Sequence, residues 1–193
     1  MPELDARERK NAWRKLIAGL FALIPQDARH KLDVGLTARL RECLAGKEVR
    51  LLLGFAPLPD EPNLSPFFRR WLAEGGRLAM PRWLGGADLS LRLVTDIDSQ
   101  LRPGRAGILE PRPGLPEVPP EELGLVIAPG RAFSEELVRM GRGSGCYDSL
   151  FRGQQPFKVG VAYDFQVFPE LPAGAGDVPV DVVVTPSRIV GQA

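Results

Sequence analysis

Apolar residues near the start of the chain recur at the spacing that places them on one face of a helix. This pattern predicts an amphipathic helix over residues 6–24, which Pro25 ends, and a second helix over 28–44. Leucine stands at every fourth position of the second helix, so we expect that helix to serve core packing. Ser65 followed by Pro66 predicts the start of a third helix, which the next glycine pair ends.

Short apolar runs elsewhere in the chain predict buried strands. The expected strands cover residues 49–55, 77–80, 89–94, 124–128, 158–162 and 180–185. The first of these strands, the third helix and the second strand follow one another through short links, an order that requires a crossover and predicts parallel pairing. Residues 102–120 are dense in Pro and Gly and are expected to form an ordered loop over the sheet. The chain is therefore predicted to be one α/β domain over 1–193, with three layers and a mainly parallel sheet flanked by helices.

Composition narrows the class of ligand. The chain has 193 residues, 44% of them hydrophobic, and 25 Lys and Arg against 24 Asp and Glu, for a net charge of +1. Such a balance gives no field that would attract nucleic acid or an anionic membrane, so a small-molecule ligand is expected. The charged N-terminus has no apolar signal core, which predicts a cytoplasmic protein. Two cysteines, Cys43 and Cys146, suggest neither a disulfide framework nor a zinc cluster.

The segment 124–148, GLVIAPGRAFSEELVRMGRGSGCYD, carries the most chemical information. It begins as a buried strand and leads into alternating glycines. In open α/β sheets ligands bind beyond the carboxyl ends of strands, where this loop must lie. Gly141, Gly143 and Gly145 would let backbone N–H groups approach an anion closely, which predicts a phosphate-binding loop.

Charged residues around these glycines extend the hypothesis. Arg139 and Arg142 can donate charge-assisted hydrogen bonds to phosphate, and Asp148 can hold a divalent cation that bridges phosphates. The loop matches neither the Walker pattern nor the full dinucleotide fingerprint. Taken alone, it is equally explained as a tight surface turn that needs positive φ angles.

Several further motifs occur in a fixed order along the chain. Pro129, Gly130 and Phe133 precede RMGRGSGCYD, and the other motifs are MPRW at 80–83, GILEP at 107–111, VGVAYDFQ at 159–166 and GDVPVDVVVT at 176–185. In this order and spacing the chain resembles the 5-formyltetrahydrofolate cyclo-ligase family, also called methenyltetrahydrofolate synthetase. The resemblance extends over almost the whole chain and supports the single α/β domain.

The resemblance implies roles for particular residues. It implies an ATP site made of Lys10, Arg14, Arg139, Gly141, Arg142, Gly143, Ser144, Gly145, Cys146, Tyr147 and Asp148. It also implies Asp148 and Asp177 as Mg²⁺ ligands, Glu61 and Trp83 as folate-binding residues, and Arg142 and Tyr147 as the residues of the chemical step. Taken singly, without the resemblance, these residues are better explained by ordinary roles: Lys10 and Arg14 as a solvated helix face, Glu61 as a loop charge and Trp83 as a core residue.

The implied reaction is the ATP-dependent cyclisation of 5-formyltetrahydrofolate to 5,10-methenyltetrahydrofolate, with release of ADP and phosphate. ATP is then a co-substrate, Mg²⁺ the cofactor and a reduced folate the other partner, and a monomer is expected. Two alternatives stay open: a divergent paralogue that keeps the nucleotide site but uses another substrate, and a non-catalytic folate- or nucleotide-binding protein.

Five positions depart from the family pattern. They are Ser134 for the usual Asp, Leu137 for Gly, Cys146 for the first Tyr of Tyr-Tyr-Asp, Ser149 for Arg and Gly176 for His. Cys146 removes an aromatic face and a hydroxyl from the loop, which permits a change of substrate affinity. Its expected role is that of a small packing residue at the start of a helix.

Overall fold

An eight-stranded sheet forms the centre of the molecule. The structure is a computed structural model that describes residues 6–104, 107–153 and 155–192. In sheet order the strands are β13 (Ile189–Gly191), β12 (Val182–Val184), β10 (Phe157–Val161), β7 (Leu125–Pro129), β1 (Leu52–Leu53), β2 (Leu78–Gly85), β3 (Asp88–Val94) and β6 (Glu117–Val118). The strands from β12 to β2 pair in parallel, and antiparallel strands complete both edges. The predicted parallel pairing of the first two strands is confirmed, with Leu52 opposite Leu78.

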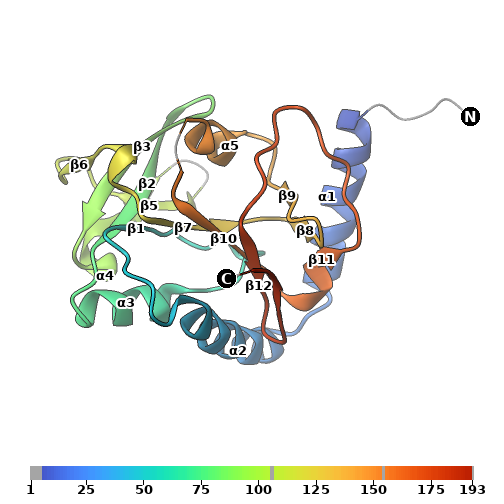
Figure 1. Ribbon diagram of the computed structural model, residues 1–193, viewed down its shortest axis with the longest axis horizontal. Helices are drawn as coiled ribbons and strands as arrows, with labels where there is room; N and C mark the ends of the chain where they lie inside the picture. Colours follow the sequence, from blue (N-terminus) through green and yellow to red (C-terminus); the bar gives the residue numbers. More distant parts are fainter. Residues whose placement is uncertain (1–5, 105–106, 154, 193) are drawn as a thin grey trace, which may run out of the picture.

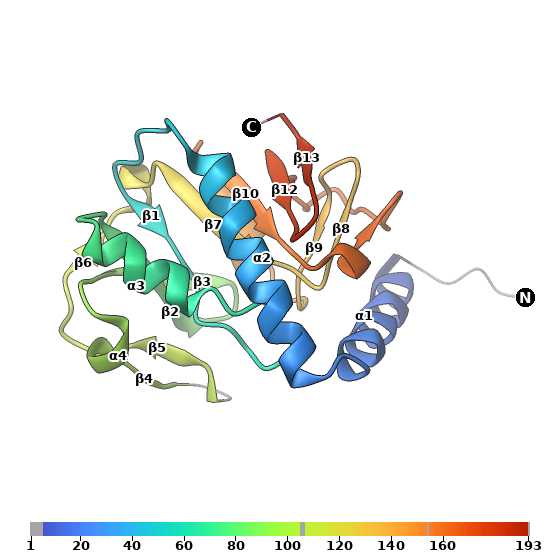
Figure 2. The same cartoon turned by 90° about the horizontal axis from the view of Figure 1, so that it is seen from below.

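Helices cover both faces of this sheet. The helices are α1 (Ala6–Ala22), α2 (Gln26–Leu44), α3 (Ser65–Ala73), α4 (Ile97–Gln100) and α5 (Cys146–Phe151), and 3-10 turns lie at η2 (Pro120–Glu122) and η3 (Asp164–Gln166). α2 and α3 lie on one side of the sheet and α5 on the other (Figures 1 and 2). Side chains of β1 alternate between two cores, since Leu52 packs with α2 and α3 while Leu51 and Leu53 face the α5 side. The predicted α/β fold, with a mainly parallel sheet flanked by helices, is confirmed.

A smaller sheet supports the first helix. It contains β11 (Val167–Phe168), β8 (Ala132–Ser134) and β9 (Arg139–Met140). α1 lies beside this sheet (Figure 1), and Ile17 packs with Met140 in a separate apolar cluster. Trp13 meets Phe168 edge to face, with ring centroids 4.7 Å apart. These contacts fix the first helix next to β9, the strand that leads into the glycine loop.

Local details differ from the sequence-based expectations. Residues 102–120 are not only a loop, because they contain parts of the short pair β4 (Leu101–Pro103) and β5 (Leu109–Pro111), and also β6. Strands of two or three residues are too short to show a period, which explains why they were missed. β2 is longer than 77–80, so all of MPRW lies inside a strand. Among the helices of the described residues, none combines the length and the apolarity that a membrane crossing needs.

The turn between β8 and β9 explains two departures from the family pattern. Leu137 has φ 65°, the left-handed region where glycine is at ease and where other residues lose roughly 1–2 kcal/mol. Its N–H donates to the carbonyl of Ser134 at 2.9 Å, and its carbonyl accepts from Val180 at 3.0 Å. The Ser134 hydroxyl also accepts from the N–H of Val138 at 3.2 Å. Leu137 packs against the sheet core, which offsets the backbone cost.

Candidate active site

A pocket of about 550 Å³ lies beyond the carboxyl ends of β1 and β7. Its walls come from α1, the segment after β1, the second half of β2, the β5 region and the glycine loop. Every residue that the sequence analysis assigned to a site lines it: Lys10, Arg14, Glu61, Trp83, Arg139, Gly141, Arg142, Gly143, Ser144, Gly145, Cys146, Tyr147, Asp148 and Asp177. Tertiary structure thus gathers groups that lie far apart in the chain around one cavity, although their individual roles stay predictions.

The glycines of the loop are needed for two different reasons. Gly143, with φ 107°, and Gly145, with φ 72°, adopt backbone conformations that other residues rarely adopt. Gly141 leaves room for a neighbouring side chain, because a Cβ there would lie 2.7 Å from Nη1 of Arg139 and would displace that guanidinium. The interpretation as a positive-φ turn is therefore correct for two glycines, yet the same loop also forms a wall of the pocket.

Two basic residues of α1 contact other walls of the pocket, one the glycine loop and the other Asp177. Lys10 and Arg14 are four positions apart and therefore share a helix face. Nε of Arg14 donates to the carbonyl of Gly141 at 2.9 Å. Lys10 pairs with Asp177 and is only 17% exposed, and Asp177 also accepts from the N–H of Gly174 at 2.8 Å. The alternative of a freely solvated helix face does not describe these two residues.

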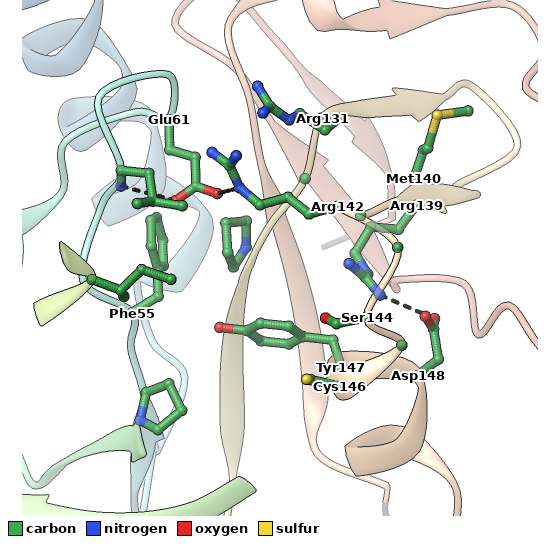
Figure 3. A pocket seen from close by; sticks show the side chains of 18 of the residues that line it. Phe55, Glu61, Arg131, Arg139, Met140, Arg142, Ser144, Cys146, Tyr147 and Asp148 are labelled. Atoms are coloured by element: carbon green, nitrogen blue, oxygen red, sulfur yellow. Dashed lines mark hydrogen bonds and ion pairs between the residues drawn. The ribbon is translucent and has the colours of Figure 1, made fainter. Parts of the chain in front are cut away.

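A buried ion pair supports the loop from within. The side chain of Arg139 is 3% exposed and lies 3.0 Å from Oδ1 of Asp148. The same oxygen accepts from the N–H of Val178 at 3.2 Å. The guanidinium also stands over the ring of Tyr147, 5.3 Å from its centroid. Figure 3 shows this pair on the side of the pocket formed by the glycine loop.

The two carboxylates fit a magnesium ion only together with a phosphate. Asp148 and Asp177 both line the pocket, and each is paired with a cationic side chain. Among the described residues, no group of three or more His, Cys, Asp or Glu side chains is placed to hold a metal ion. Mg²⁺ commonly binds to one or two carboxylates, with phosphate oxygens and water completing its coordination. The residues present therefore suit Mg²⁺ that arrives with a nucleotide.

The opposite wall carries Glu61, which forms an acidic pair with its chain neighbour Asp60. Oε1 of Glu61 lies 2.9 Å from Nε of Arg142, and its other oxygen accepts from the N–H of Leu58 at 3.0 Å (Figure 3). Asp60 pairs with both Arg142 and Arg131. Burial would raise the pKa of Asp60, but the two arginines outweigh it and lower that pKa. Burial would likewise lower the pKa of Arg142, but Glu61 and Asp60 raise it above its ordinary value.

In the pocket walls, the hydroxyl oxygen of Tyr147 and Nε of Arg139 are buried and have no hydrogen-bond partner among the residues that the structure describes. The Tyr147 hydroxyl points away from α5 and toward the side of Phe55 (Figure 3). Burial, followed by the charge of Glu61, raises the pKa of Tyr147 well above its ordinary value, so the hydroxyl keeps its proton. A buried hydroxyl without a partner costs free energy. This hydroxyl is therefore available to a ligand as a hydrogen-bond donor.

The remaining wall is apolar and suits a flat ring. It consists mainly of Phe55, Pro81, Leu89, Ile108 and Leu109. Trp83 completes it, and its indole Nε1 donates to the carbonyl of Gly86 at 3.1 Å. Cys146 is a free thiol at the start of α5, as expected, and its Sγ lies 3.8 Å from the same carbonyl; its packing role stays a prediction.

Asp60, Arg131 and most of the apolar wall were missed by sequence reasoning. Asp60 immediately precedes Glu61 in a proline-rich loop that follows a strand, which is the one signal that pointed toward it. Arg131 lies beyond the end of β7, a position typical of ligand contacts in α/β sheets.

The model of the 5-formyltetrahydrofolate cyclo-ligase family matches residues 6–186. The chain belongs to this family. The resemblance inferred from the order of motifs is thereby confirmed, and it covers the glycine loop, α1 and the acidic pair alike.

Individual relatives agree with the family assignment. The chain is 30% identical over 132 residues to a probable 5-formyltetrahydrofolate cyclo-ligase of Schizosaccharomyces pombe, covering 61% of this chain and 65% of that one. It is 38% identical over 95 residues to 5-formyltetrahydrofolate cyclo-ligase of Escherichia coli, covering 47% of this chain and 52% of that one. The matches thus span between about half and two thirds of these relatives' length.

Solved structures match over most of the chain. The 5,10-methenyltetrahydrofolate synthetase of Aquifex aeolicus superposes with a TM-score of 0.83 at 34% identity, covering 93% of this chain and 91% of the other. A 5,10-methenyltetrahydrofolate synthetase from Mycoplasma pneumoniae gives a TM-score of 0.74 at 21% identity, covering 92% and 98%, and supports the fold alone. The family's fold is therefore present here almost end to end.

Proposed function

We propose that the protein catalyses the ATP-dependent cyclisation of 5-formyltetrahydrofolate to 5,10-methenyltetrahydrofolate, releasing ADP and phosphate. One observation carries the proposal: a single pocket joins a cationic glycine loop to an apolar wall that ends at a carboxylate. The first half suits the phosphates of ATP, and the second suits a flat pterin ring whose N–H groups seek an acceptor. Family membership supports the same reaction.

The reaction takes place in two steps, phosphorylation of the formyl oxygen and ring closure. The formyl oxygen attacks the γ-phosphorus of ATP, so that an O–P bond forms, the bond to the β-phosphate oxygen breaks and ADP leaves. N10 then attacks the activated carbon, the C–O bond breaks, phosphate leaves and N10 loses its proton. Both steps ask the protein mainly for alignment and for neutralisation of charge.

The residues of the pocket suit these tasks. The loop N–H groups, Lys10 and Arg14 line the pocket and would hold phosphate oxygens, and Arg142 would neutralise the charge of the transferred group. The protonated hydroxyl of Tyr147, which has no partner within 6–104, 107–153 and 155–192, can donate to an oxygen of the reacting groups. Glu61 and Trp83 would hold the folate ring from the other side.

We propose Mg²⁺ as the cofactor, held by Asp148 and Asp177 together with the phosphates. When bound, the ion neutralises charge that develops on the transferred phosphoryl group. Asp177→Asn should weaken the dependence of turnover on Mg²⁺, so that the half-saturating concentration rises several-fold, as a titration of initial rates would measure. Asp181→Asn, which changes a carboxylate outside the pocket, is the matched control. An equal metal response in the Asp177 variant and the parent would remove Asp177 from this role.

The departures from the family pattern give little support to another substrate. Ser134 and Leu137 form the β8–β9 turn, and neither they nor Ser149 line the pocket. Cys146 does line it, but its sulfur faces the carbonyl of Gly86. We therefore favour the family reaction over that of a divergent paralogue.

A monomeric state and a cytoplasmic location are further parts of the proposal. Both are expectations from the sequence analysis. Light scattering on the purified protein tests the first, and fractionation of the producing cells tests the second.

The decisive experiment is an absorbance assay for methenyltetrahydrofolate with purified protein, 5-formyltetrahydrofolate and Mg-ATP, and with each component omitted in turn. Product that requires all components is the expected result. Protein that is folded and binds ATP but forms no product would contradict the proposal and favour one of the alternatives, a different substrate or a binding role.

A further inference from the structure

Arg142 links the two halves of the pocket. Its backbone belongs to the glycine loop, but its guanidinium reaches across to the acidic pair (Figure 3). Nε lies 2.9 Å from Oε1 of Glu61, and Nη2 contacts Asp60. A residue of the glycine loop is therefore held by the carboxylates of the opposite side of the pocket.

In this arrangement both carboxylate oxygens of Glu61 already accept hydrogen bonds from the protein. The side chain is only 8% exposed, and each of its oxygens has a donor inside the protein, Arg142 for one and the N–H of Leu58 for the other. The Leu58 contact lies within the loop of Glu61 itself and can persist when a ligand binds. A ring that presents N–H groups to Glu61 therefore competes with Arg142 for the remaining oxygen.

Arg142 is the movable member of the cluster. Its side chain is 35% exposed and its backbone is flanked by Gly141 and Gly143. Arg131, the other partner of Asp60, is 13% exposed, and its backbone is fixed at both its N–H and its carbonyl, which contact Met140 at 2.7 Å and Gln166 at 3.0 Å. Asp60 can keep its pair with Arg131 when Arg142 departs, so departure leaves no unpaired carboxylate at this position.

We propose that Arg142 couples the binding of the two substrates by exchanging between the acidic pair and the phosphates of the nucleotide. A folate that donates hydrogen bonds to Glu61 displaces the Arg142 guanidinium toward the loop. A nucleotide whose phosphates bind that guanidinium leaves Glu61 free to accept hydrogen bonds from the folate. Asp60 is a positioning residue that sets how firmly Arg142 is held away from the nucleotide. This inference rests on the proposed function and deepens it.

The exchange has a thermodynamic consequence. In the free protein each substrate must break the contacts of Arg142 with the acidic pair, and the second substrate to bind is spared that cost. Each substrate should therefore tighten the binding of the other by the same factor, because such coupling is reciprocal. Couplings between sites are typically about 5–150-fold, and we expect at least about 5-fold here.

The test measures binding without turnover. Titration calorimetry gives the dissociation constant of a non-hydrolysable ATP analogue with Mg²⁺, without and with saturating 5-formyltetrahydrofolate, and then the reverse pair. In the parent, the ratio of the dissociation constant without the second ligand to the dissociation constant with it should be at least about 5 in both directions. In Arg142→Gln it should fall to within about twofold of 1. Arg70→Gln, which removes an exposed arginine of α3 outside the pocket, should keep the parent ratio.

Asp60→Asn separates this role from a merely structural one. Weakening the hold on Arg142 should make the analogue bind more tightly in the absence of folate and should reduce the ratio, whereas a structural defect would only weaken binding. An unchanged ratio in Arg142→Gln, or only weaker binding in Asp60→Asn, overturns the inference. A parent that binds both ligands without coupling overturns the inference alone, and a parent that binds the analogue but no folate overturns the proposed function with it.

Discussion

The two halves of the pocket are built on different principles. In the loop half every acidic group has its own cation, as in the pairs of Lys10 with Asp177 and Arg139 with Asp148. In the opposite half Asp60 and Glu61 share the cation of a residue from across the cavity, Arg142, beside an apolar wall. The first half is thus organised in advance, while the second must exchange a partner to bind a ligand. Variants of single residues can separate these two behaviours.

The largest expected effect concerns the stability of the loop half. Arg139→Met removes a buried cation and leaves Asp148 without its partner, which should lower the free energy of unfolding by about 3–5 kcal/mol. Urea unfolding followed by circular dichroism measures this. The control Arg70→Met, at an exposed pair on α3, should leave stability near that of the parent. Full stability in Arg139→Met would show that the pair does not organise the loop.

The next largest effect is expected on folate binding, in the half of the pocket that contains Glu61. Glu61→Gln removes the charge that would receive the N–H groups of the folate ring, and hydrogen bonds to charged groups contribute about 1.5–3 kcal/mol. The KM for 5-formyltetrahydrofolate should rise by about 10-fold or more, whereas the KM for ATP should change far less. Steady-state kinetics with each substrate varied in turn measures both constants. Exposed Glu48→Gln provides the matched control, and equal shifts for both substrates would count against the assignment.

A smaller effect, on the KM for ATP or on turnover, is expected from substitution of a basic residue of α1. Arg14→Ala removes a cation and its hydrogen bond to Gly141, which should raise the KM for ATP or depress turnover by about 10-fold while the fold stays intact. Lys15→Ala makes the same change of charge on the exposed neighbouring position of the helix. If Arg14→Ala and Lys15→Ala behave alike, Arg14 is not part of the nucleotide site.

The smallest effect on stability is expected at Tyr147. Because its hydroxyl is buried and has no partner in the described part of the chain, Tyr147→Phe should leave the free energy of unfolding unchanged or raise it by about 1 kcal/mol, while turnover falls. Thermal unfolding and the absorbance assay give the two readouts. A loss of stability would mean that the hydroxyl has a partner in the free protein, and unaltered turnover would remove it from the chemical step.

Much of the fold followed from local patterns. The periodic leucines of α2, the Ser-Pro start of α3 and the β-branched run before Thr185 each predicted an element that the structure contains. The pair β8 and β9 was not predicted, because its turn uses Leu137 where positive φ normally signals glycine. Short strands within 102–120 were also missed, since pairing between segments of two or three residues depends on their partners and not on their own sequence.

The sequence by itself determined which residue types meet in the site. Motif order identified the family and named the glycine loop, the α1 cations, Glu61 and the two aspartates, and all of these line one pocket. Local sequence can do this because motif spacing reflects backbone requirements such as the positive φ of Gly143 and Gly145.

Only the tertiary structure decided how these groups are paired. Arg142 and Glu61 are 81 positions apart and Lys10 and Asp177 are 167 apart, so no periodicity could indicate that they meet. The structure also revealed the pair of Asp60 and Arg131, and it showed which buried polar atoms of the described residues lack a partner. Ion pairing depends on distance and burial, which are properties of the packed chain and not of any single segment.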